Sequence, residues 1–225
     1  MSEHDDLWVF GYGSLMWRPG FDFVERQTAR LVGYQRAFCI YSTHHRGNEQ
    51  RPGLVLGLDR GGSCVGIAYR VAAEKRAETI AYLRAREQIS GVYQETFVPI
   101  AVGHSVVPEI SAITYVVEQA HPSYARRLPF AKQVSIIRGA HGLSGPNVEY
   151  LVNTAEHLRE LGIRDRNLER LTAAAGGLFA TSYSDGEALR RRAYALAHAS
   201  RDTVASAPKL RPGERRRFMY RMWLS

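Results

Sequence analysis

The chain has 225 residues, of which 45% are hydrophobic and 10% aromatic, enough apolar material to bury a sizeable core. No apolar run approaches the ~20 residues that a membrane-spanning helix needs, so no membrane partner is expected. Residues 1–6 are polar and acidic, with neither the basic nor the apolar segment of a secretory signal, so we expect a cytoplasmic protein.

The net charge of +8 is unevenly distributed along the chain. Residues 209–225 hold six basic side chains against one acidic side chain, which leaves +3 for residues 1–208. A basic tail can bind phosphate backbones. The same tail carries Phe218, Tyr220 and Trp223, which favour docking on a folded domain. We therefore expect residues 200–225 to pack on the domain and treat nucleic-acid binding as the less favoured alternative.

Seven segments show the alternation or the short apolar runs of β-strands. They are residues 7–12, 29–34, 36–41, 54–58, 64–71, 93–100 and 112–117. Residues 59–62, Asp-Arg-Gly-Gly, predict a hairpin turn between the fourth and fifth strands. Residues 43–53 form a long polar loop, and loops of this length are either active-site walls or disordered.

Five segments have helical patterns. They are residues 72–88, 129–139, 146–161, 167–175 and 186–198. Strands first and helices later predict an α+β fold in a single domain spanning residues 1–225, with a helical C-terminal part. Seven short strands need their edges closed, so the sheet is expected to curl into a small mixed barrel flanked by helices.

The glycine turn, Gly11-Tyr12-Gly13-Ser14, directly follows the first predicted strand. Glycines let the backbone approach a ligand closely, and consecutive exposed N–H groups can cradle a carboxylate or an oxyanion. An ordinary tight turn is the alternative. A Gly-x-Ser-x-Gly nucleophile is excluded for Ser14, because Met16 stands where the second glycine should be.

Glu87 is the side chain best suited to acid–base chemistry. Ile80, Leu83 and Glu87 share one face of the helix predicted for residues 72–88. This face should pack on the sheet, because the other positions carry the charged side chains Glu74, Lys75, Glu78, Arg84 and Arg86. Burial and the negative end of the helix dipole both favour the protonated acid and raise its pKa. The alternative is a carboxylate that reaches water or pairs with Arg84 or Arg86.

Glu95 is the rival carboxylate, because Tyr93, Glu95 and Phe97 share a face of their strand, although a cross-strand ion pair is its more ordinary role. Three histidines lie in predicted loops without metal-ligand spacing and are expected to be exposed: His44, His45 and His141. Cys39 and Cys64 are predicted to be buried free thiols. No metal and no cofactor is expected.

Several motifs together resemble the ChaC-type γ-glutamylcyclotransferases. In chain order they are Phe10-Gly11-Tyr12-Gly13-Ser14-Leu15 with Trp17 and Pro19-Gly20-Phe21, then Gly33-Tyr34-Gln35-Arg36-Ala37-Phe38, His45-Arg46-Gly47 with Pro52-Gly53, Arg86-Glu87, and residues 142–151. The resemblance runs from about residue 8 to about residue 163. The glycine turn and Arg86-Glu87 are its most specific parts.

The resemblance implies a small mixed barrel and the release of 5-oxoproline from glutathione, which leaves Cys-Gly. It implies that Glu87 is the acid–base. It also implies that one turn holds the γ-glutamyl group: Gly11, Tyr12, Gly13, Ser14, Leu15 and Met16. Further candidate substrate contacts are Arg46, Tyr93 and Tyr150. Arg46 is a candidate because a guanidinium pairs well with a carboxylate.

Two alternatives stay open at this point. The same fold can act on other γ-glutamyl amines or dipeptides. A non-catalytic protein whose basic tail binds nucleic acid belongs to a different class. The sequence does not indicate the oligomeric state.

Overall fold

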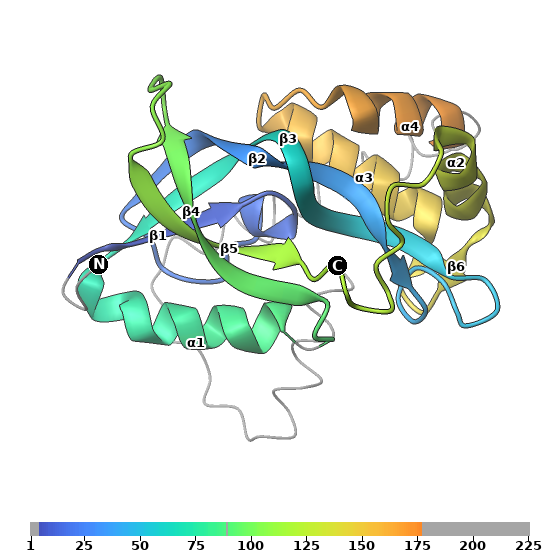
Figure 1. The fold of residues 1–225 in the computed structure, drawn as a ribbon, viewed down its shortest axis with the longest axis horizontal. Coiled ribbons are helices and arrows are strands. Elements are labelled where there is room, and N and C mark those ends of the chain that lie inside the picture. The colour runs from blue at the N-terminus through green and yellow to red at the C-terminus, as the bar shows by residue number, and fades with distance from the viewer. Residues whose placement is uncertain (1–4, 89, 177–225) are drawn as a thin grey trace, which may run out of the picture. The chain divides into compact units, whose positions relative to one another are not determined.

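A computed structural model of the chain describes residues 5–88 and 90–176 (Figure 1). The described residues up to Ala175 form one compact unit. The helix predicted for residues 186–198 and the basic tail at residues 200–225 lie outside the described residues. A single domain over residues 1–225, with the tail packed on it, stays a prediction.

The centre of the unit is a closed five-stranded barrel with the strand order β1-β3-β2-β4-β5. Its strands are β1 (Leu7–Gly11), β2 (Glu25–Ser42), β3 (Gly53–Val71), β4 (Tyr93–Val102) and β5 (Ile110–Val117). A short parallel pairing of β1 with β5 closes the barrel, and the other pairings are antiparallel. The predicted mixed barrel in an α+β fold is confirmed.

The number of strands was wrong, because two predicted pairs of strands are two continuous strands, β2 and β3. The expected hairpin turn at residues 59–62 lies inside β3. Val32 pairs with Ser63 and Tyr34 pairs with Arg60, so one residue of β2 lies opposite Gly61 and Gly62. Both glycines have positive φ, 102° and 65°. They form a bulge that bends the paired strands without ending them.

Within residues 5–88 and 90–176, four α-helices flank the barrel: α1 (Arg76–Glu87), α2 (Phe130–Gly139), α3 (Asn147–Glu160) and α4 (Arg166–Gly176). The short elements are the 3₁₀ turns η1 (Ser14–Met16) and η2 (Ala73–Lys75) and the strands β6 (His141–Gly142) and β7 (Gly145–Pro146). Figure 1 shows α1 along one side of the barrel and the other three helices grouped together. None of the described helices is long and apolar enough to cross a membrane.

Both faces of β1 are buried, and this fixes the position of the glycine turn at its end. Val9 belongs to an apolar cluster that also contains Leu83 of α1 and Leu151 of α3. Its neighbour Phe10 belongs to a second cluster, with Leu31 among its members. Because successive side chains of a strand point to opposite faces, β1 is held between the two clusters.

Asn147, the first residue of α3, fastens this helix to the barrel. Its side chain is fully buried; its Oδ1 accepts from the Leu54 N–H and its Nδ2 donates to the Leu54 carbonyl, each at 2.7 Å. A buried backbone group without a partner would cost free energy, so the amide satisfies both groups of β3 at once. Residues of the first turn of α3, including Tyr150, are thereby placed against β3.

Candidate active site

The glycine turn leaves β1 at Gly11 and enters the 3₁₀ turn η1. The Met16 N–H donates to the Gly13 carbonyl at 2.9 Å, which closes this turn. Tyr12 and Met16 are buried, whereas Gly13 is half-buried and Ser14 is exposed. The turn therefore presents its backbone at Gly13 and Ser14 while its large side chains anchor it to the core.

Glu87 is the last residue of α1, and its side chain is 11% exposed. Its inward orientation agrees with the face that it shares with Leu83. Burial raises the pKa of the Glu87 carboxyl above its usual value, and the neighbouring Arg86 guanidinium opposes this rise. Arg86 Nε lies 3.1 Å from Glu87 Oε1. A carboxyl with a raised pKa can both accept and return a proton near neutral pH.

Arg86 joins α1 to the glycine turn. Its Nη2 donates to Ser14 Oγ at 2.9 Å, and its Nη1 donates to the Arg18 carbonyl at 2.7 Å. The sequence interpretation placed Arg86 among the outward-facing charges of the helix, and this was wrong, because Arg86 is buried. The buried positions Thr79, Leu83 and Arg86 follow helical spacing, but two of the three are polar, so no apolar pattern marked Arg86 as buried.

Four tyrosines lie in the electrostatic neighbourhood of Glu87: Tyr12, Tyr93, Tyr115 and Tyr150. Burial raises the pKa of Tyr12, Tyr93 and Tyr150, and the charge of Glu87 adds to each rise. The Tyr93 hydroxyl donates to the Leu56 carbonyl at 2.7 Å, and the Tyr150 hydroxyl accepts from the Leu56 N–H at 3.4 Å. The structure thus brings together the glycine turn, Glu87 and two of the candidate substrate contacts.

Arg46 lies beside this group. It comes from the loop of residues 43–53, yet it is only 9% exposed. Its guanidinium lies over the Tyr150 ring, 5.5 Å from the centroid, and its Nη1 is 3.8 Å from Glu149 Oε2. The loop therefore contributes a buried cation next to a candidate contact residue, as an active-site wall does.

Glu95 has a different environment from Glu87. Its two carboxylate oxygens accept from Arg84 Nη2 and Nε, each at 2.8 Å, and the Tyr115 hydroxyl donates to it at 3.2 Å. The hydrogen bond from Arg84 lowers the pKa of Glu95 and outweighs its partial burial. Glu95 is therefore held as an ionised partner of α1, a role that differs in detail from the predicted cross-strand pair.

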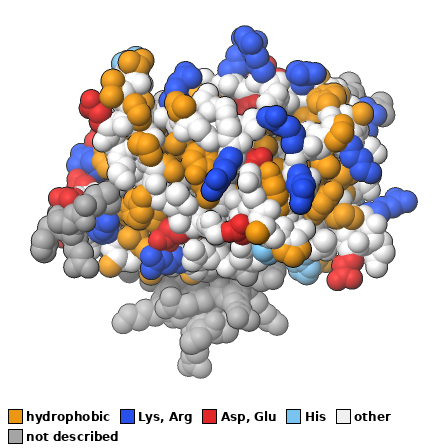
Figure 2. Space-filling model, viewed as in Figure 1, with side chains coloured by type: hydrophobic (Ala, Val, Ile, Leu, Met, Phe, Trp, Pro, Cys, Tyr) orange, Lys and Arg blue, Asp and Glu red, His pale blue; other side chains and the backbone are white. Residues whose placement is uncertain are grey.

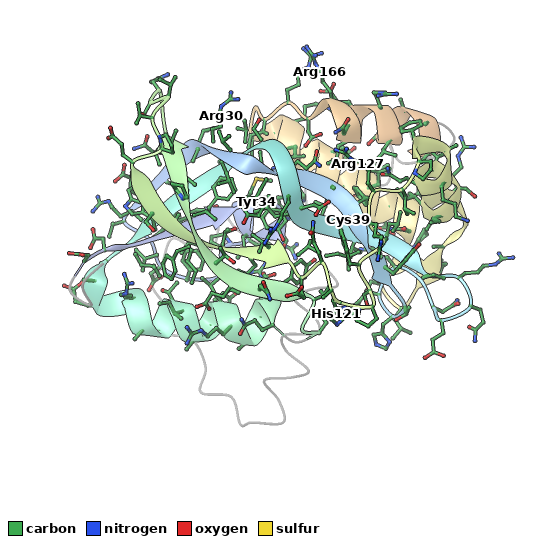
Figure 3. The ribbon with its side chains drawn as sticks, in the orientation of Figure 1. Arg30, Tyr34, Cys39, His121, Arg127 and Arg166 are labelled. Atoms are coloured by element: carbon green, nitrogen blue, oxygen red, sulfur yellow. The ribbon has the colours of Figure 1, made fainter. Side chains whose placement is uncertain are left out.

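The remaining candidates offer no competing site. Cys39 on β2 (Figure 3) and Cys64 are free and buried, as predicted, and burial raises the pKa of Cys39 to about 12. His44 and His141 are exposed, but His45 is half-buried, and its Nδ1 lies 3.0 Å from Ser144 Oγ. Within residues 5–88 and 90–176, no group of three or more His, Cys, Asp or Glu could hold a metal ion.

The model of the ChaC-like protein family matches residues 7–176. The chain belongs to the ChaC-like family. The resemblance noted in the sequence is thereby confirmed, and the matched range contains both the glycine turn and Glu87.

Curated relatives match most of the chain. The glutathione-specific γ-glutamylcyclotransferase of Escherichia coli is 35% identical over 184 residues, which cover 82% of this chain and 79% of that protein. The human glutathione-specific γ-glutamylcyclotransferase 1 is 33% identical over 174 residues, covering 76% and 78%. A crystal structure of a yeast γ-glutamyl cyclotransferase specific to glutathione shares the fold, with a TM-score of 0.67, 22% identity, and coverage of 76% and 96%.

Proposed function

We propose that this ChaC-like protein is a γ-glutamylcyclotransferase that converts glutathione to 5-oxoproline and Cys-Gly. The observation that carries the proposal is a buried carboxyl, Glu87, linked through Arg86 to Ser14 of the glycine turn. The printed activity of the relatives in Escherichia coli and human supports the same reaction and substrate.

The reaction is an intramolecular displacement. The α-amine of the γ-glutamyl group attacks its own γ-carbonyl carbon and forms the C–N bond of a five-membered ring. The amide bond to cysteine then breaks, and a proton that left the α-ammonium is delivered to the departing amine. No external nucleophile enters, so the protein contributes chiefly by folding the substrate into the reactive geometry, an effect worth up to about 7–11 kcal/mol.

Each part of the site has a role in this proposal. Glu87 takes the proton from the ammonium and gives it to the leaving amine, for which its raised pKa is suited. Backbone N–H groups of the glycine turn hold the γ-glutamyl group and stabilise the oxyanion that forms on the γ-carbonyl. Arg46 pairs with the carboxylate at the far end of glutathione, and Tyr93 and Tyr150 line the path between.

A substrate panel tests the proposal. Release of 5-oxoproline is measured from glutathione, from γ-glutamyl dipeptides and from γ-glutamyl amines. We expect glutathione to have the highest kcat/KM. Faster turnover of a dipeptide or amine would replace glutathione as the substrate within the same fold. The absence of 5-oxoproline from every substrate would overturn the proposed activity.

Arg86 makes the acid–base assignment testable through pH. The Arg86 guanidinium favours ionised Glu87, so replacing Arg86 by glutamine removes this influence and raises the pKa of Glu87 further. The acid limb of kcat/KM against pH, which reports the essential base in the free enzyme, is then expected to move to higher pH. An unmoved acid limb in a folded Arg86→Gln variant would show that the limb belongs to another group.

Lys75→Gln is the matched control for this experiment. Lys75 is a cation of the same helical segment, and it pairs with exposed Glu78 at 3.0 Å. Exposed pairs of this kind are worth about 0–1 kcal/mol. The pH profile of Lys75→Gln is expected to coincide with that of the wild type.

The location and the basic tail complete the proposal. A cytoplasmic protein fits the two buried free thiols, since reducing compartments keep cysteines unpaired.

On the face shown in Figure 2, Lys and Arg side chains are interspersed with hydrophobic and acidic ones. The nucleic-acid alternative depends on residues 209–225, outside the described residues, and it requires salt-sensitive binding that is lost when these residues are deleted.

A further inference from the structure

Arg36 lies behind the glycine turn and connects three elements. Its Nε donates to the Tyr12 carbonyl at 2.6 Å, and its Nη2 donates to the Val65 carbonyl of β3 at 2.8 Å. Its Nη1 pairs with Asp165 Oδ2 at 2.8 Å. The side chain is 2% exposed, so these bonds replace all of its hydration. Such a buried, fully engaged guanidinium holds its partners in one geometry.

The bond to Tyr12 fixes the direction of the next backbone N–H. The peptide between Tyr12 and Gly13 is trans, so its carbonyl and its N–H point in opposite directions. Because the carbonyl points to Arg36, the Gly13 N–H points away from Arg36. It has no hydrogen-bond partner among the described residues. Gly13 is half-buried between buried Tyr12 and exposed Ser14, so the turn is accessible at this peptide.

Asp165 fixes Arg36 in turn. Its Oδ1 accepts from the Asn167 and Leu168 N–H groups, each at 3.1 Å, and so caps the first turn of α4. Its Oδ2 is the partner of Arg36. One carboxylate therefore joins the start of α4 to the glycine turn, which lies some 150 residues earlier in the chain.

We propose that Arg36, held by Asp165, is a positioning residue that aims the Gly13 N–H at the oxyanion formed during 5-oxoproline release. The inference rests on the proposed function and adds a residue whose action is indirect. Arg36 touches the backbone of the turn and acts on the substrate only through the Tyr12–Gly13 peptide.

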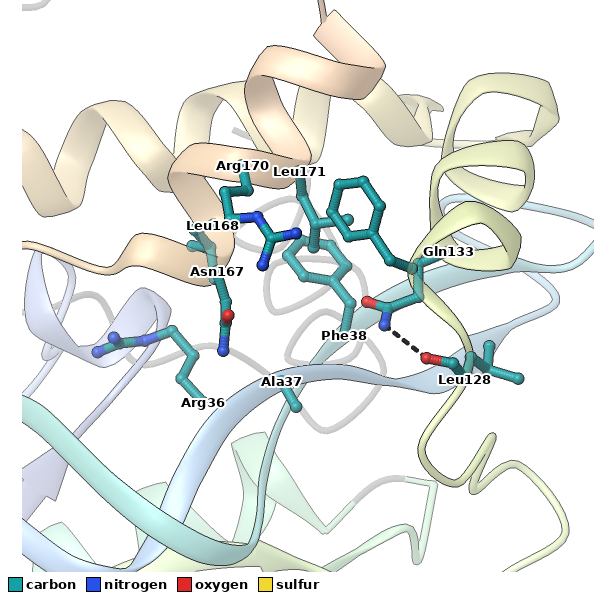
Figure 4. Close-up of a pocket in the computed structure, with 10 residues that line it drawn as sticks. Arg36, Ala37, Phe38, Leu128, Gln133, Asn167, Leu168, Arg170 and Leu171 are labelled. Carbon is teal, nitrogen blue, oxygen red and sulfur yellow. Dashed lines mark hydrogen bonds between the residues drawn. The ribbon is translucent and has the colours of Figure 1, made fainter.

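A cavity of about 240 Å³ adjoins Arg36 and suggests a direct test. Figure 4 shows the Arg36 side chain running from β2 away from the cavity, while Asn167 and Arg170 enter it from α4. Its lining includes Arg36, Phe38, Phe130, Asn167, Leu168 and Arg170. Because Arg36 lines this partly open cavity, truncating it to alanine opens the space left by its side chain to the cavity.

The experiment compares Arg36→Ala with the wild type on glutathione, without and with millimolar guanidinium chloride. We expect kcat to fall at least tenfold in Arg36→Ala, and by no more than the ~10²–10³-fold that complete loss of an oxyanion donor costs. KM should change much less. Guanidinium should restore part of kcat with saturating dependence, and sodium chloride at equal concentration should not. A merely structural role would not produce this chemical rescue.

Two further variants keep the inference falsifiable. Arg36→Lys keeps the charge, but its single ammonium cannot serve all three partners, so it should fold and still lose kcat. Asp165→Asn keeps a capping oxygen for α4 and removes the anion, so it should lose less kcat than Arg36→Ala. Arg170→Ala is the control. Arg170 lines the same cavity and its guanidinium lies over the Phe130 ring, and the variant should keep kcat within about twofold.

The outcomes separate the two proposals. If wild-type protein releases no 5-oxoproline from any γ-glutamyl substrate, the proposed function fails. If the wild type is active and folded Arg36→Ala or Arg36→Lys matches its kcat, the positioning role is overturned. Loss of kcat in Arg36→Ala without any rescue by guanidinium also overturns it.

Discussion

Replacing Glu87 by glutamine is expected to lower kcat for 5-oxoproline release from glutathione by about 10²–10⁴-fold, the usual contribution of a positioned acid–base group. The amide has nearly the shape of the carboxyl and can still accept a hydrogen bond from Arg86. It cannot take the proton from the α-ammonium. KM should therefore change little, and the defect should appear in kcat, measured by quantifying 5-oxoproline.

Glu95→Gln is the matched control, because it makes the same chemical change on the rival carboxylate. Its partner Arg84 is 57% exposed, so this ion pair is worth about 0–1 kcal/mol. We expect Glu95→Gln to retain activity within a few-fold of the wild type. Full activity in folded Glu87→Gln, or loss of activity in Glu95→Gln alone, would move the acid–base role away from Glu87.

Glu87→Gln and Glu95→Gln are also expected to differ in how their thermal stability depends on pH. Burial raises the folded-state pKa of Glu87 above its unfolded value, so the folded state favours the protonated form. The stability from this protonated group is fully present below the unfolded pKa and is lost as pH rises through the folded pKa. Thermal melts should therefore show Glu87→Gln gaining Tm relative to the wild type as pH increases across this window. Glu95, whose pKa is lowered, should show no such gain.

The periodicity of the hydrophobic residues predicted most of the secondary structure of this protein. Alternating apolar residues located all five strands, and the spacing of Ile80, Leu83 and Glu87 oriented α1 correctly. The strand count failed at Gly61 and Gly62, because two glycines with positive φ serve a bulge as well as a hairpin turn. Local sequence cannot separate these two uses, since the outcome depends on the partner strand.

The arginines of the site lay beyond the reach of sequence patterns. A basic residue is usually exposed, so Arg86 was assigned to the outer face of its helix and Arg36 received no role. Their burial depends on partners far away in the chain: Ser14 is 72 positions from Arg86, and Asp165 is 129 positions from Arg36. Resemblance to the family marked both segments, but only the three-dimensional contacts show what the guanidinium groups hold.

Gly66→Ala is expected to destabilise the fold by about 2–3 kcal/mol, the upper part of the usual range for overpacking. Gly66 is buried in β3, where a Cβ would lie 2.2 Å from the Gly11 carbonyl oxygen and 2.7 Å from Cζ of Phe10. Both contacts are far below van der Waals distance, and the nearer one is to backbone. For a chain of this size the expected loss corresponds to a Tm about 4–12 °C lower.

The same substitution should also reduce catalysis, because the displaced atom belongs to the first residue of the glycine turn. The strand must move away from Gly66, and the Gly11–Gly13 backbone moves with it, so kcat should fall even at temperatures where the variant is folded. Gly139→Ala, the control, has nothing within 4 Å of the added Cβ and sits at the end of α2. It should gain up to about 1 kcal/mol, because alanine is the better helix former. An unchanged Tm and kcat in Gly66→Ala would mean that β1 and β3 do not hold the turn as rigidly as their contact distance implies.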